Sequence, residues 1–176
     1  VLYPSDATSM YRLVEAAANH RGMVYLRAGR PKSPVIYGAD ERFQIGGSKV
    51  LRHSGSDVLT IVAAGVTLFE TLKAHDQLKT AGIATRVIDL YSVAPIDRAT
   101  LLDCTTATRG RILTVEDHYA HGGLGDAVLS AVGTEGIVVH KLAVRAIPRS
   151  GKPDELVDHF GIGARSIVET AKQIIK

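Results

Sequence analysis

The residues best suited to chemistry are gathered in one stretch, residues 116–128, which reads EDHYAHGGLGDAV. Two carboxylates and two imidazoles in its first half, Glu116, Asp117, His118 and His121, are groups that could bind zinc or iron. Its glycines could instead form a phosphate-binding turn at the start of a helix. The stretch follows the apolar run RILTV, and acids at the end of a strand also favour the N-terminus of the next helix. We favour this structural interpretation over a metal site, a phosphate site or a catalytic loop.

Three basic residues, Arg27, Arg30 and Lys32, stand at the end of a short predicted strand at residues 23–28. A guanidinium at the end of a strand can bind a phosphate group through two parallel hydrogen bonds. The spacing makes these residues candidates for an anion site, with solvated surface charge as the alternative.

The common nucleotide and hydrolase motifs are missing. The spacing of Gly122, Gly123 and Gly125 differs from the G-x-G-x-x-G pattern that lets a backbone approach a pyrophosphate. A P-loop is excluded because Pro153 follows the only Gly-Lys pair, where Ser or Thr is needed for the metal. No G-x-S-x-G elbow occurs, so a serine hydrolase of the α/β type would lack its nucleophile.

Composition narrows the class of protein further. Of the 176 residues, 45% are hydrophobic, and no apolar run approaches the roughly 18 residues that span a bilayer. The first residues lack the pattern of a signal peptide, so we expect a soluble, cytoplasmic protein without a membrane partner. The single Cys104 most resembles a small core residue. The net charge of +3 comes from scattered basic residues without interleaved aromatics, so we expect no nucleic-acid partner.

The hydrophobic pattern alternates between strands and helices after a helix capped by Ser5 or Asp6 and a connector rich in proline and glycine. Strands are predicted at residues 23–28, 50–52, 58–64, 84–90, 111–116 and 137–144. Helices are predicted at residues 66–81, after Pro95 and Asp97, at 124–132, and twice near the C-terminus, with breaks at Gly161 and Gly163.

This alternation predicts a three-layer αβα sandwich around a mostly parallel five-stranded sheet. The strand around Val50 should run antiparallel to the others. The HSGSD link that follows it is too short for a parallel crossover.

Seven segments together resemble the C-terminal part of transketolase, in the same order and over essentially the whole chain. They are PSDATSMYRLVEAA, YLRAGRP, FQIGGSKV, TIVAAGVTLFETLKA, RVIDLYSVAPID, GRILTVEDHYAHGGLGDAV and IPRSGKPDEL. Deoxyxylulose-phosphate synthases and the beta subunits of 2-oxo acid dehydrogenases share this domain. However, EDHY followed by GGLGDAV, and RSGKP before the terminal helices, are transketolase-like details.

The resemblance implies an enzyme that uses thiamine diphosphate and magnesium, or calcium, to move a two-carbon ketol unit from a ketose phosphate to an aldose phosphate. It implies that the intact enzyme is a homodimer and that its substrates are sugar phosphates. It divides the chain into the tail of a pyrimidine-binding domain (1–34), a linker (35–48) and a complete C-terminal domain (49–176). The family's cofactor-binding and catalytic residues lie in parts that precede Val1, so we expect no catalytic, cofactor-binding or metal-binding residue here and an inactive fragment.

One residue of the chain matches a substrate-binding position of the family. Arg30, in AGRP, corresponds to the arginine of an SRP-like motif that binds the sugar phosphate, although Ala28 and Gly29 remove the usual hydroxyl. The alternative is that Arg30 pairs with a local carboxylate such as Asp40 or Glu41. For the whole chain, the alternatives are a free-standing αβα interaction or regulatory module, a small nucleotide-binding domain, and one of the related thiamine-diphosphate enzymes, a deoxyxylulose-phosphate synthase or a 2-oxo acid dehydrogenase beta subunit.

Overall fold

The computed structural model describes residues 1–30 and 32–176. Its sheet has five strands in the order β1-β3-β2-β4-β5. The strands are β1 (Lys49–Arg52), β2 (Thr60–Ala63), β3 (Arg86–Asp89), β4 (Arg111–Tyr119) and β5 (Val138–Val144). The helices are α1 (Ala7–Ala18), α2 (Val66–Thr80), α3 (Arg98–Thr106), α4 (Leu124–Val132), α5 (Pro153–His159) and α6 (Ala164–Ile174).

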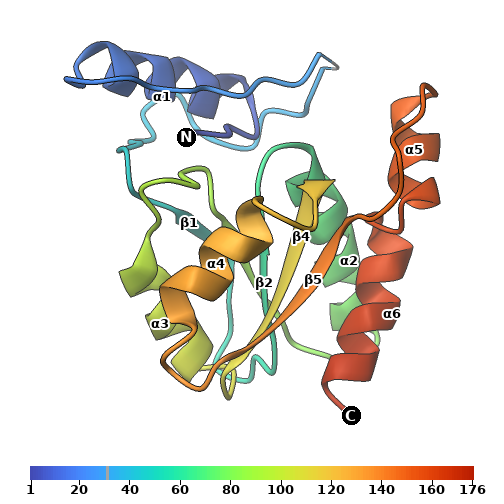
Figure 1. The fold of residues 1–176 in the computed structure, drawn as a ribbon. Coiled ribbons are helices and arrows are strands. Elements are labelled where there is room, and N and C mark those ends of the chain that lie inside the picture. Colours follow the sequence, from blue (N-terminus) through green and yellow to red (C-terminus); the bar gives the residue numbers. More distant parts are fainter. Residues whose placement is uncertain (31) are drawn as a thin grey trace.

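The predicted sandwich is confirmed. Helices α2 and α6 pack on one face of the sheet in a cluster that includes Leu68, Leu78 and Ile167, and α3 and α4 cover the other face. Figure 1 shows these two helix layers with the strands between them. Strand β2 is buried along its whole length, as expected for a central strand with helices on both faces.

The antiparallel strand is also confirmed. β1 pairs with β3 in antiparallel fashion, whereas β2–β3, β2–β4 and β4–β5 are parallel pairs. The short link nevertheless does not form a hairpin, because β3 lies between β1 and β2.

The prediction of a strand at residues 23–28 was wrong. Only Leu26 forms a bridge there, to Leu2, which is bridged in turn to Ser92. Met23, at the start of the predicted strand, is 99% exposed. A strand needs a neighbour along its length, and here Leu2 provides one for a single residue.

Local capping explains where α1 and α3 begin. The Asp6 side chain accepts a hydrogen bond from the Ser9 backbone N–H at 2.7 Å, and Ser9 completes a capping box. Asp97 caps α3 in the same way through Thr100, as predicted, but the helix starts at Arg98 and leaves Pro95 outside it.

The N-terminal segment, residues 1–30 with α1, lies across the carboxyl ends of the strands (Figure 1). Figure 1 shows α1 beyond the edge at which β4 ends. A third apolar cluster joins this segment to the sheet; its buried members are Leu2, Leu13, Tyr37, Phe43 and Tyr91. Among the described residues, no helix is long and apolar enough to cross a membrane.

The carboxyl ends of β2 and β4 meet at the middle of the sheet. From β2 the chain crosses through α2 to β3 on one side, and from β4 it crosses through α4 to β5 on the other. Open α/β sheets bind ligands at such a switch point, because the two connections leave a crevice between them. A ligand-binding site of this fold is therefore expected in the crevice between the ends of β2 and β4.

Candidate functional site

Tyr3 occupies the crevice at the switch point. Its ring packs directly on Gly65, where β2 ends, and a Cβ atom at Gly65 would overlap the ring. Gly65 also has a φ of 58°, a conformation that side chains disfavour. The chain thus fills the centre of its own ligand crevice with an aromatic side chain that is 7% exposed.

Around Tyr3 lies an ionic cluster. Arg27 contacts Asp117 through both ends of its guanidinium, with N–H···O distances of 2.9 and 2.8 Å. The Tyr3 hydroxyl donates to Asp117 Oδ2 at 3.0 Å, and the Arg27 guanidinium lies 4.4 Å from the centre of the Tyr3 ring. Burial, followed by the nearby Asp117 charge, raises the pKa of Tyr3, so the hydroxyl remains a donor. Of the three basic residues proposed for an anion site, Arg27 therefore binds a carboxylate of the protein itself, Asp117.

Glu116 points to the start of α4 instead. Its carboxylate accepts the backbone N–H groups of Leu124 at 2.7 Å and Gly125 at 3.0 Å. A Cβ atom at Gly123 would overlap this carboxylate, which explains the glycine at that position. Burial raises the pKa of Glu116. A bound phosphate would need these same donors, so Glu116 takes the place of an external anion at this helix N-terminus.

The remaining members of this loop do not combine with Glu116 and Asp117 into a metal cluster. His118 and His121 lie at exposed positions. In the described part of the chain, no group of three or more His, Cys, Asp or Glu side chains is arranged to hold a metal ion.

Arg30 and Lys32 are exposed and line a cavity of about 390 Å³. The cavity is bounded by Tyr3 and Ser5, by the start of α1 and by Gly65. The carboxylate suggested as a local partner for Arg30, Glu41, pairs with Lys49 at 3.1 Å instead. The other suggested partner, Asp40, lines a different cavity.

Sequence reasoning missed a buried acid at the end of β3. Asp89 is fully buried and accepts hydrogen bonds from the Ser5 hydroxyl at 3.0 Å and the Tyr37 hydroxyl at 2.7 Å. Burial raises the pKa of Asp89 to about 7. Its neighbour Asp6 accepts the backbone N–H groups of Ile36 and Tyr37. The sequence did show an acid at the end of the predicted strand. However, the residues that bind it, Ser5 and Tyr37, are 84 and 52 residues away along the chain.

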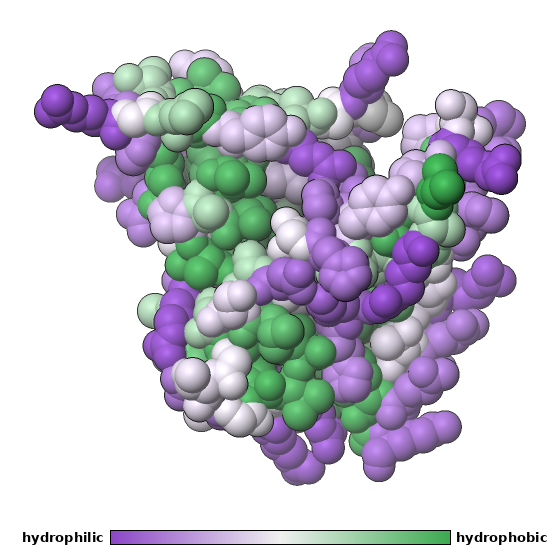
Figure 2. All heavy atoms as spheres, viewed as in Figure 1, coloured by the Kyte–Doolittle hydropathy of each residue, from purple (hydrophilic) through white to green (hydrophobic). Residues whose placement is uncertain are grey.

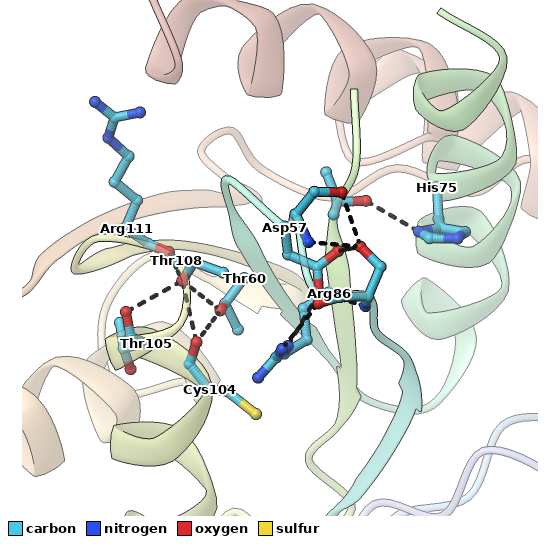
Figure 3. Close-up of polar contacts among 11 residues, drawn as sticks. Asp57, Thr60, His75, Arg86, Cys104, Thr105, Thr108 and Arg111 are labelled. Atoms are coloured by element: carbon cyan, nitrogen blue, oxygen red, sulfur yellow. Dashed lines mark hydrogen bonds and ion pairs between the residues drawn. The ribbon is translucent and has the colours of Figure 1, made fainter. Parts of the chain in front are cut away.

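The opposite edge of the sheet carries a separate polar network (Figure 3). Asp57 binds Arg86 at 3.2 Å, and the Thr60 and Thr108 hydroxyls lie 2.8 Å apart. Cys104 is 3% exposed, as expected for a small core residue, and burial raises the pKa of its thiol. These contacts join the amino ends of the strands to α3 and lie away from the switch point.

Comparison with known proteins identifies the domain. Residues 46–167 match the family model described as transketolase, C-terminal domain. The chain belongs to the transketolase C-terminal domain family.

Relatives and solved structures extend the match to nearly the whole chain. Transketolase-like protein 1 of Bos taurus is 51% identical over 99% of this chain, and transketolase of Homo sapiens is 48% identical over 99%. A solved split-gene transketolase, described as an inactive beta4 tetramer, has a TM-score of 0.92 and 35% identity; the match covers 99% of this chain and 57% of that one. The chain spans 30% of the first of these relatives and 28% of the second.

Proposed function

We propose that this chain is the C-terminal part of a transketolase that transfers a two-carbon ketol unit from a ketose phosphate to an aldose phosphate. The observation that carries the proposal is the position of Arg30. It combines a family-like motif with an exposed guanidinium at the wall of a cavity, three residues after a structurally fixed arginine. Lys32 adds a second positive charge to the same cavity.

Residues 1–34 are proposed to belong to the preceding pyrimidine-binding domain, residues 35–48 to be the linker, and residues 49–176 to be the C-terminal domain. The apolar cluster around Leu2 and Leu13 also contains Tyr37, Phe43 and Tyr91, so it packs the three proposed parts against one another. The family match, which starts at residue 46, is consistent with this division.

The cofactor is proposed to bind outside this chain. Magnesium and calcium need several oxygen ligands, and the carboxylates of the crevice are already engaged by Arg27, by Tyr3 and by the start of α4. The described residues therefore do not fit thiamine diphosphate and its metal, and no step of the ketol chemistry is assigned to them. The chain alone should neither bind the cofactor nor transfer ketol units. Calorimetry with thiamine diphosphate and magnesium should show no binding; saturable binding in the micromolar range would contradict this.

In the complete enzyme, this part is proposed to support substrate binding and homodimer formation. Large apolar side chains are exposed on the N-terminal segment, including Tyr11, Val14, Met23 and Tyr25, and exposed apolar surface of this kind marks interaction sites. Figure 2 shows hydrophobic surface both around this segment and over α4, with polar side chains between.

The test of the substrate site is Arg30→Ala in the full-length enzyme. A hydrogen-bonded guanidinium–phosphate pair is worth about 1.5–3 kcal/mol, so kcat/KM for phosphorylated substrates should fall roughly 10- to 150-fold. The loss should appear in KM, because the phosphate is bound in the ground state as well as in the transition state. Unphosphorylated sugars should be unaffected. Equal effects on both kinds of substrate, or no effect, would leave Arg30 without a phosphate role.

A further inference from the structure

The contact between Arg27 and Asp117 joins parts of the chain that are 90 residues apart. Both carboxylate oxygens of Asp117 accept N–H groups from the guanidinium, and its backbone oxygen accepts a third contact at 3.3 Å. The two side chains are 35% and 21% exposed. A bidentate, partly buried pair fixes direction as well as distance, unlike a single contact between mobile surface chains.

Asp117 also fixes one wall of the cavity that Arg30 lines. Tyr3 donates its hydroxyl to Asp117 and lies beneath the Arg27 guanidinium, and its ring borders the cavity. The Arg27 backbone N–H donates to the Leu2 carbonyl at 2.9 Å, which anchors the chain just before it reaches Arg30. The Tyr3 hydroxyl and the Arg27 guanidinium therefore meet at the same carboxylate, next to a separate backbone anchor on Leu2.

The pairing also sets the charge of the site. Arg27 and Asp117 neutralise each other, whereas Arg30 and Lys32 line the cavity together with one carboxylate, that of Asp6, which is bound to backbone N–H groups. Asp117→Asn would leave one acceptor oxygen in place of two, so the Arg27 guanidinium would lose its two-pronged contact and the Tyr3 hydroxyl would compete for the remaining oxygen. The Leu2 contact would still hold the backbone at Arg27, but the side chains that border the cavity would lose their fixed direction.

We propose that Asp117, from the end of β4, is a positioning residue that sets Arg30 for the phosphate of a sugar phosphate by holding Arg27 and Tyr3. The inference rests on the proposed function of Arg30. It gives the end of β4 a role in substrate recognition at a distance, in addition to the contact of Glu116 with α4.

Two variants of the full-length enzyme test the inference. Asp117→Asn keeps the size of the side chain and removes the charge. Arg27→Lys keeps the charge and removes the two-pronged geometry. Each should raise KM for a phosphorylated acceptor about 3- to 10-fold, which is part of the effect expected for Arg30→Ala, and should leave kcat within about twofold. The unphosphorylated form of the same acceptor should keep its KM.

A matched control lies in α4. Among the described residues, the Asp126 side chain binds Lys141 at 2.6 Å and the Gly122 backbone N–H, and neither contact touches Arg27 or Tyr3, so Asp126→Asn should leave both KM values unchanged. Calorimetric binding of the phosphorylated acceptor, which needs no turnover, should weaken 3- to 10-fold for Asp117→Asn and Arg27→Lys. Far-UV circular dichroism establishes whether each variant is folded; if Asp117→Asn does not fold, Arg27→Lys decides the matter.

The outcomes separate this inference from the proposed function. If Arg30→Ala selectively impairs phosphorylated acceptors but Asp117→Asn and Arg27→Lys do not, the positioning role is wrong and the substrate site stands. If the two variants impair both kinds of acceptor equally, Asp117 has a structural role only. If Arg30→Ala itself shows no selectivity, the proposed site and the positioning role fail together.

Discussion

The buried carboxylate of Asp89 makes a quantitative prediction about stability and pH. Its pKa is about 7 in the folded chain, against an ordinary value of 3.8, chiefly because burial disfavours the charged form. Asp6 adds a smaller effect in the same direction, and hydrogen bonds from Tyr37 and Ser5 oppose it. The folded state therefore retains a proton that the unfolded chain releases between about pH 4 and pH 7.

The sign and size of the effect follow from this difference. Because the folded chain binds more protons in that window, stability contributed by Asp89 is present below about pH 4 and is lost as the pH rises through about 7. A difference of about three pKa units corresponds to about 4 kcal/mol. Asp89→Asn cannot ionise, and its amide can still contact the two hydroxyl groups.

The free energy of unfolding of both proteins should be measured in urea between pH 5 and pH 8. The Asn variant should become more stable relative to the original chain as the pH rises, by up to about 4 kcal/mol at pH 8. Asp103→Asn, at an exposed position, is the control and should follow the original chain at every pH. A stability difference between Asp89→Asn and the original chain that stays constant with pH would refute the reasoning.

Three further perturbations test the crevice and the core. Gly65→Ala should lower the melting temperature more than Gly82→Ala, because both have positive φ but only at Gly65 would a Cβ atom meet the Tyr3 ring; equal losses would contradict the close contact. Glu116→Gln should cost about 1–3 kcal/mol in urea unfolding by placing an amide against the α4 N–H groups, whereas exposed Glu169→Gln should cost under about 0.5. The Cys104 thiol should react with a thiol reagent only as fast as the chain opens, so a rapid reaction in native buffer would place the residue outside the core.

The layers of the fold could be predicted from the sequence, because alternating apolar strands and helices leave few ways to bury both faces of a sheet. The antiparallel direction of β1 followed from the length of one loop. Its pairing with β3 rather than β2 could not be predicted, because a short loop limits direction without choosing the neighbour. The strand expected at residues 23–28 failed for a related reason, since local propensity does not supply a partner.

The site could be predicted only in part. Family resemblance directed attention to Arg30, and the acid-to-helix pattern anticipated the contact of Glu116 with α4. The pairing of Arg27 with Asp117 could not be anticipated, because both residues had other plausible roles and 90 residues separate them. The charge state of Asp89 depends on complete burial, which only the folded chain reveals.

The carboxyl ends of three neighbouring strands are occupied by other parts of the chain itself. β2 ends against Tyr3, β3 ends in Asp89 bound to Ser5 and Tyr37, and β4 ends in acids bound to Arg27 and to α4. In other open α/β folds these positions face a ligand, but here most of them hold the N-terminal segment. A segment held from three strands cannot shift easily. Under the proposed function, the crevice would serve substrate recognition indirectly, because the segment that fills it leads to Arg30.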